Sequence, residues 1–105
     1  MKLAEYKLDY WDGESIKESI TIRDITVVLL RLTQPIRNSE PQRNLIATDR
    51  LSNILWIADL PDNESQCYGT LELKENKIYG YAGSELCEID DKTGKILSKQ
   101  FLPWY

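Results

Sequence analysis

Residues 67–102, CYGTLELKENKIYGYAGSELCEIDDKTGKILSKQFL, are the stretch from which the fold class follows. Four short apolar runs are separated by polar turn sequences, and Asn76 and Gly94 suit the positive φ that tight turns require. Strands joined by tight turns pair antiparallel. The segment therefore predicts a four-stranded meander, with strands at 67–73, 77–82, 86–90 and 95–102.

The upstream half shows the same period-two pattern. Ala4, Tyr6, Leu8 and Tyr10 alternate with charged residues, which predicts a strand over residues 4–10 with one apolar face. A looser alternation follows at Ile16, Ile20 and Ile22. Further strands are expected at 25–32, 45–48 and 54–58.

Residues 25–32 are compatible with either a strand or a short helix. The stretch is β-branched and nearly continuous in apolar residues, as in a strand covered on both faces. No helix cap, alanine or glutamate supports the helix. We therefore expect an all-β chain, a single domain over 1–105, built of antiparallel meanders with about seven to nine short strands.

Composition excludes several kinds of chemistry. The chain has 105 residues, 13 basic and 17 acidic side chains, and no histidine. Without histidine, Ser/His/Asp and Cys/His nucleophiles and histidine-ligated metal sites are absent. Neither a secretory signal nor a run of about 20 apolar residues occurs. We expect a cytoplasmic protein in which Cys67 and Cys87 are reduced packing residues.

An internal repeat relates residues 46–56 to residues 87–97, at an offset of 41. Each copy reads strand, Asp, three residues, Asn or Gly, and then an apolar strand. A period near 40 is typical of a β-propeller blade, but about two and a half units are too few for a closed propeller. Recurring hairpin chemistry is the alternative explanation, because Asp and Gly are common in any such turn.

The second copy carries a resemblance to known proteins. The sequence Asp90-Asp91-Lys92-Thr93-Gly94-Lys95-Ile96-Leu97, preceded by Lys77-Ile78-Tyr79-Gly80-Tyr81, is similar to a blade of quinoprotein-type propellers. Residues 45–101 resemble a group of small uncharacterised bacterial proteins of about this length. Ser98 and Lys99 stand where the quinoprotein motif has aromatic docking residues, so the resemblance implies a β-rich fold and no quinone cofactor.

Arginine placement suggests one candidate contact. All five arginines fall within residues 23–50, and Arg37 and Arg43 lie in a polar loop at 33–44. The planar guanidinium favours bidentate contacts, so this loop could hold an acidic partner; a solvated loop is the alternative. Nucleic acid is not expected, because a chain with a formal charge of −4 offers little phosphate neutralisation.

Aromatic residues suggest a second contact surface. Tyr79 and Tyr81 share one face of their predicted strand, with Gly80 leaving the opposite face open to close approach. Tyr79, Tyr81 and Trp56 could form an interface or a stacking platform, although such aromatics also fill cores. Trp104 and Tyr105 should dock on their own sheet or on a second chain.

Acidic clusters carry little functional signal. Residues 90–94 lack the ligand spacing of a calcium loop and predict a hairpin turn. No metal, cofactor or catalytic residue is predicted, although a small hydrolase using two carboxylates is kept as a third hypothesis. The expected function is non-catalytic binding of another protein, with immunity-type toxin neutralisation as one form of it and a homodimer as one assembly. The alternative is a small-molecule or saccharide binder.

Overall fold

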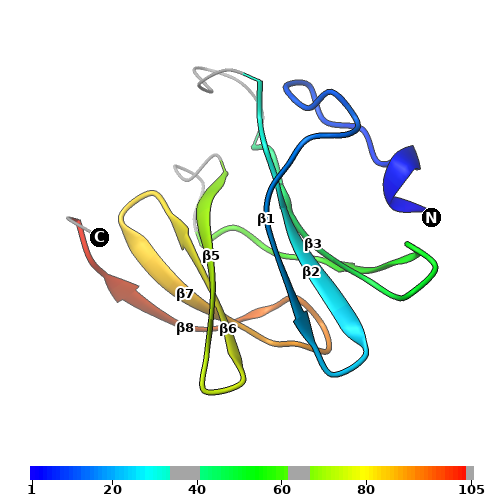
Figure 1. Cartoon of the computed structure of the whole chain (residues 1–105). Helices are drawn as coiled ribbons and strands as arrows, with labels where there is room; N and C mark the ends of the chain where they lie inside the picture. The colour runs from blue at the N-terminus through cyan, green and yellow to red at the C-terminus, as the bar shows by residue number, and fades with distance from the viewer. Residues whose placement is uncertain (34–40, 62–66, 104–105) are drawn as a thin grey trace.

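The computed structural model describes residues 1–33, 41–61 and 67–103, which form two four-stranded antiparallel sheets (Figure 1). The all-β prediction is confirmed. The first sheet has the order β1-β2-β3-β4 and the second β5-β6-β7-β8. The strands are β1 Ile16–Ile22, β2 Ile25–Leu30, β3 Leu45–Thr48, β4 Ile54–Ile57, β5 Tyr68–Lys74, β6 Lys77–Ala82, β7 Glu85–Ile89 and β8 Ile96–Phe101.

The second sheet is the predicted meander. Its turns use the expected residues, because Asn76 has a φ of 61° and Gly94 a φ of 77°. Glu75 also adopts a positive φ, so the whole β5–β6 turn lies in the left-handed region. No strand end in this sheet differs from its predicted position by more than one residue.

Within the first sheet, β2 and β3 are covered on both faces, as the apolar run at 25–32 predicts for β2. Val27 and Leu29 of β2 face a core shared with the second sheet. Val28 and Leu30 of the same strand face a second apolar cluster that includes Trp11. The strand itself ends at Leu30, two residues earlier than expected.

The strand predicted over residues 4–10 is wrong. A short 3-10 helix, η1, occupies Leu3–Glu5, and the chain that follows lies on the outer face of the first sheet, where Tyr6 and Leu8 pack against the second cluster. Alternation there reflects burial of one side of an extended segment, which does not require a paired strand. No helix in the described ranges is long and apolar enough to cross a membrane.

The two predicted repeat turns occupy equivalent places in the two sheets. Asp49 begins the β3–β4 turn and Asp90 the β7–β8 turn, and each carboxylate accepts hydrogen bonds from backbone amides ahead of it. The positive φ falls on Ser52 in the first turn, not on the expected asparagine. Each ladder then has an irregularity that leaves a leucine as the extra residue, Leu55 in β4 and Leu97 in β8.

The two sheets meet along two seams around the shared core. At the first seam, Lys17 Nζ of β1 donates to Gly69 O and Leu71 N of β5 donates to Glu18 Oε2. At the other, Trp56 Nε1 of β4 donates to Asp91 O at 2.9 Å. The strands of the described ranges do not join into a closed barrel or propeller.

Candidate functional site

Tyr79 and Tyr81 project from one face of β6, as predicted, and both are half-buried. Gly80 points to the opposite face, where a Cβ atom would lie 2.6 Å from Cδ1 of Tyr68 and 3.1 Å from Cδ2 of Leu45. The close approach predicted at Gly80 is therefore made by core residues of this chain. The tyrosine side is the outer face of the second sheet.

Strand register arranges this outer face in two rows. Tyr79 lies between Glu72 of β5 and Glu88 of β7, and Tyr81 lies between Thr70 and Leu86. Each tyrosine thus has cross-strand neighbours on both sides, close enough for side-chain contact. The Tyr81 hydroxyl donates to Leu102 O at 2.5 Å, which holds that ring toward the C-terminal end of the sheet.

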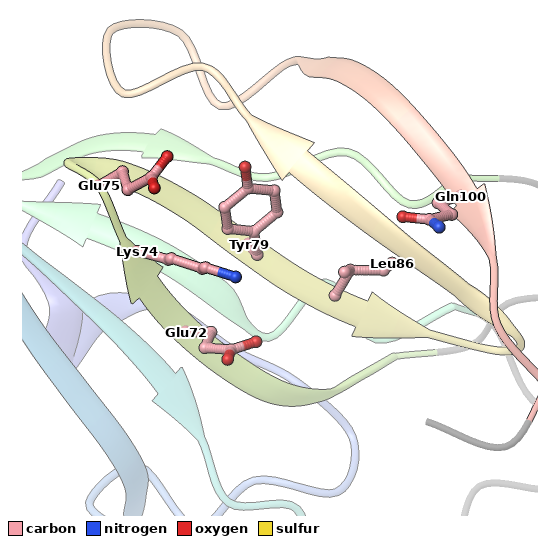
Figure 2. Close-up of a pocket in the computed structure, with 6 residues that line it drawn as sticks. All are labelled: Glu72, Lys74, Glu75, Tyr79, Leu86 and Gln100. Carbon is pink, nitrogen blue, oxygen red and sulfur yellow. The ribbon is translucent and has the colours of Figure 1, made fainter.

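A shallow depression of about 320 Å³ lies over the first row (Figure 2). Tyr79 stands at its centre, and Figure 2 shows carboxylate, ammonium and amide groups around the ring. The lining residues are Glu72, Lys74, Glu75, Tyr79, Leu86 and Gln100. The depression combines an aromatic ring and a leucine with polar groups of both charges.

The outer face of the first sheet is packed against other residues of the chain, and the outer face of the second sheet is not part of either apolar cluster. Residues 3–11 pack over the outer face of the first sheet and complete an apolar cluster there. Neither apolar cluster includes Tyr79, Tyr81 or Leu86 of the second sheet. Within the described ranges, the second sheet therefore has one core-forming face, and its other face presents these residues outward.

Trp56 does not belong to a surface platform, so that interpretation is wrong. The side chain is 6% exposed and lies in the shared core. Its ring packs on the β7–β8 turn so closely that a Cβ on Gly94 would lie 2.6 Å from Trp56 Cε3. Because Trp56 is held between the sheets, it cannot stack on a ligand beside Tyr79.

Arg43 serves this chain's own fold. Its Nε donates to Ala58 O at 3.0 Å, and its Nη2 donates to Ile57 O at 2.6 Å and to Asp59 Oδ1 at 3.1 Å. Arg43 thus pairs with an acidic group of its own chain, whereas the sequence suggests an acidic partner molecule. Arg43 also contacts the N-terminal segment through its backbone, since the Tyr6 hydroxyl donates to Arg43 O.

Three predicted contact residues, Arg37, Trp104 and Tyr105, lie outside the residues that the structure describes. The two cysteines are free thiols: Cys87 lies in the core, and burial raises the pKa of the partly exposed Cys67. The sequence Asp90–Gly94 forms a hairpin turn, as predicted, with Gly94 N donating to Asp90 O. Among the described Cys, Asp and Glu side chains, no three come together as metal ligands.

Two buried polar side chains, those of Asn44 and Tyr68, are not predicted from the sequence. The Asn44 side chain donates to Leu30 O and Tyr68 O and accepts from Tyr68 N at 2.8 Å, which ties β2 to β5. Tyr68 packs in the core and donates its hydroxyl to Asp59 O, and burial raises the pKa of that hydroxyl. Nothing in the sequence marks Asn44, which is one of several polar residues ending a loop.

A family model matches residues 8–101 of this chain, and its description is a domain of unknown function, DUF7957. The match spans every strand of both sheets. No curated protein and no solved structure matches the chain.

Proposed function

This chain belongs to the DUF7957 family, and from its own surface we propose that it is a non-catalytic module that binds another protein through the outer face of its second sheet. The observation that carries the proposal is the contrast between the sheets. The first sheet has an apolar cluster on each face of β2 and β3, whereas the second presents Tyr79, Tyr81 and Leu86 outward. Tyrosines in partly buried positions are enriched at the centres of protein interfaces.

The row Glu72–Tyr79–Glu88 indicates the chemistry of the partner. A glutamate is the register partner of Tyr79 on each neighbouring strand, Glu72 on β5 and Glu88 on β7, and Glu72 also lines the depression. An arginine or lysine of the partner could stack on the ring and pair with a carboxylate, which combines a cation–π contact with an ion pair. We therefore expect a partner that presents a basic side chain, and an enzyme toxin neutralised by this chain would be one such partner.

The shape of the site favours a macromolecule over a small ligand. The depression is shallow and open, whereas small-molecule sites bury most of their ligand. Saccharide binding remains the second candidate because Tyr79 has Gln100 and two glutamates nearby, but Trp56, in the core, supplies no second stacking ring. Free thiols in Cys67 and Cys87 favour a reducing compartment, so we propose a cytoplasmic location.

The test uses the tagged full chain to capture and identify a partner, followed by affinity measurements with that purified partner. Tyr79→Ala should weaken binding by about tenfold or more, the effect of losing an interface anchor. Leu51→Ala, which alters a 70% exposed leucine on the first sheet, is the matched control and should leave the affinity unchanged. Equal affinities for Tyr79→Ala and wild type would contradict the proposed surface.

A panel of sugars and metabolites separates the second candidate from the first. Saccharide binding predicts a rise in melting temperature with one sugar that Tyr79→Ala abolishes. We expect no such rise. If it occurs and no protein partner is captured, the outer face is a saccharide site.

A further inference from the structure

Three of the four edge strands are met by other parts of the chain. The edges of β1 and β5 face each other at the first seam, through Lys17 and Glu18. The edge of β4 is met by the N-terminal residues: Ile54 N donates to Met1 O, and Leu3 N donates to Ser52 O. In the described part of the chain, β8 pairs with β7 alone. Residues 59–61 approach it at two points: Asp59 N donates to Gly94 O just before the strand, and Pro61 O accepts from the Lys99 side chain.

The hydrogen-bonding direction of β8 follows from one contact. Leu102 N donates to Ser84 O at 2.7 Å, so the Leu102 amide points toward the β7 side. Along an antiparallel strand, the N–H and C=O groups of successive residues point alternately to one neighbouring side and the other. The amide and carbonyl of Gln100 therefore point toward β7, and those of Lys99 and Phe101 point away from it, at the open edge.

Two exposed apolar side chains and one internally bound lysine lie at this edge. Phe101 is 68% exposed and Leu97 is 58% exposed, which makes them two of the most exposed large apolar residues described. Lys99 carries the only charge on β8, and its ammonium is directed to Pro61 O at 3.2 Å and Glu85 Oε2 at 3.8 Å. The usual protection of an edge by outward-pointing charge is thus absent from the described edge of β8.

We propose that a second copy of this chain pairs antiparallel with β8, about a two-fold axis that passes beside Gln100. Lys99 of each copy then exchanges two backbone hydrogen bonds with Phe101 of the other, and the two Gln100 side chains face each other. The Lys99 stem covers the exposed Phe101 ring across the interface. A two-fold contact of this kind is self-complementary and closed.

Charge and the position of Pro103 favour this register over its two neighbours. The outward groups belong to odd-numbered residues, so only odd residues can pair with odd ones across the interface. One neighbouring register sets Lys99 opposite Lys99, which is unfavourable for like charges directly across two strands. The other sets Lys99 opposite Pro103, which has no amide hydrogen to donate. The register through Gln100 instead places each ammonium-bearing residue opposite an aromatic ring.

Such a dimer has one continuous eight-stranded sheet. The two-fold axis is perpendicular to the sheet, so both outer faces, each with its Tyr79 row, lie on the same side. The pairing itself rests on β8 alone and is independent of the proposed protein-binding function.

Sedimentation velocity tests the pairing at concentrations on the order of 100 μM, where a contact of micromolar affinity is saturated. The molar mass obtained for wild type should be twice the monomer mass of 12.2 kDa. Phe101→Lys should be monomeric, because it sets two ammonium groups opposite each other, while Glu85 directly across from position 101 keeps the variant folded. The double change of Lys99→Glu with Phe101→Lys should restore the dimer, since opposite charges then meet.

Leu55→Lys, in the equivalent irregularity of β4, is the control and should remain dimeric. Amide exchange gives a second readout: Lys99 and Phe101 amides should become protected as concentration rises, whereas Gln100 should be protected at all concentrations. A wild-type monomer with fast exchange at Lys99 and Phe101 would overturn the proposal. So would a dimer that Phe101→Lys leaves intact.

Discussion

At the scale of single residues, Gly80 faces the shared core from the same strand whose Tyr79 and Tyr81 face outward. Its neighbours on both sides are tyrosines that point outward, and its own inward side is filled by the Tyr68 ring. That ring cannot move away easily, because Tyr68 is 2% exposed and its hydroxyl is bonded to Asp59 O. A close-packed interior of this kind responds to a single added methyl group.

Gly80→Ala should therefore lower the free energy of unfolding by about 1–3 kcal/mol, the usual cost of overpacking a core. Gly69→Ala is the matched control in the neighbouring strand, since its added Cβ meets only Tyr81 O at an ordinary 3.9 Å. That variant should be neutral or more stable by a few tenths to about 1 kcal/mol, because alanine restricts the unfolded chain. Urea unfolding of both variants measures the difference, and equal stabilities would show that the Tyr68 ring yields freely.

Which residues form the site is harder to predict than which face they share. The alternation around Gly80 is enough to place Tyr79 and Tyr81 together. Trp56 and Arg43 have the residue types of interface anchors, yet Trp56 lies in the core and Arg43 binds Ala58 O and Asp59. Their partners are distant in sequence, so no local pattern distinguishes an anchor from a core residue.

At the scale of elements, turn residues and the alternation of apolar side chains together locate most of the strands. The turns at Asn76 and Gly94 and the alternation between them locate the second sheet to within a residue or two. Residues 4–10 show the alternation and are followed by a turn sequence at Asp12-Gly13, where Gly13 has a φ of 89°, yet they lie on the face of a sheet instead of at its edge. Alternation followed by a turn therefore does not suffice to predict a paired strand, because an extended segment lying on a sheet also buries every second side chain.

The loop that enters β1 carries an element-scale prediction. Asp12 Oδ1 accepts hydrogen bonds from Glu14 N and Ser15 N, and Oδ2 accepts one from Ser15 Oγ at 2.6 Å. These bonds, the one from the Ser15 side chain first, lower the pKa of Asp12 from 3.8 to about 2. A lowered pKa means that the carboxylate stabilises the fold above about pH 4 and that this contribution is lost as pH falls toward 2.

Ser15→Ala should raise the pKa of Asp12 toward its ordinary value, which NMR titration of the carboxyl carbon measures directly. The variant should also lose less stability than wild type between pH 4 and pH 2, because less of the Asp12 contribution remains to be lost. Comparing the two proteins removes the parallel effect of Asp49, whose pKa is lowered by hydrogen bonds from Asn53. An unchanged pKa of Asp12 in Ser15→Ala would show that the backbone amides alone hold it.

At the scale of the whole molecule, two similar sheets become one unit through contacts that neither sheet specifies alone. Apolar side chains of both sheets fill the shared core, and hydrophobic burial by itself is non-directional. Asn44 restricts shifts of one sheet against the other, because its amide makes three directional hydrogen bonds to β2 and β5. The sequence predicts each meander but not their relative placement, since this buried amide has no signature in a polar loop.

Asn44→Ala should lower the free energy of unfolding by about 3 kcal/mol, because it leaves Tyr68 N and two carbonyl oxygens buried without their partner. Lys17→Ala removes a bond across the same seam, but an exposed one, and should cost less than about 1 kcal/mol. Chemical denaturation of both variants, followed by tryptophan fluorescence, measures the two values. Because the sheets share one core, we expect a single cooperative transition in each variant. If Asn44→Ala lowers the free energy of unfolding no more than Lys17→Ala does, then apolar packing alone positions the two sheets and the hydrogen bonds of Asn44 do not contribute to their placement.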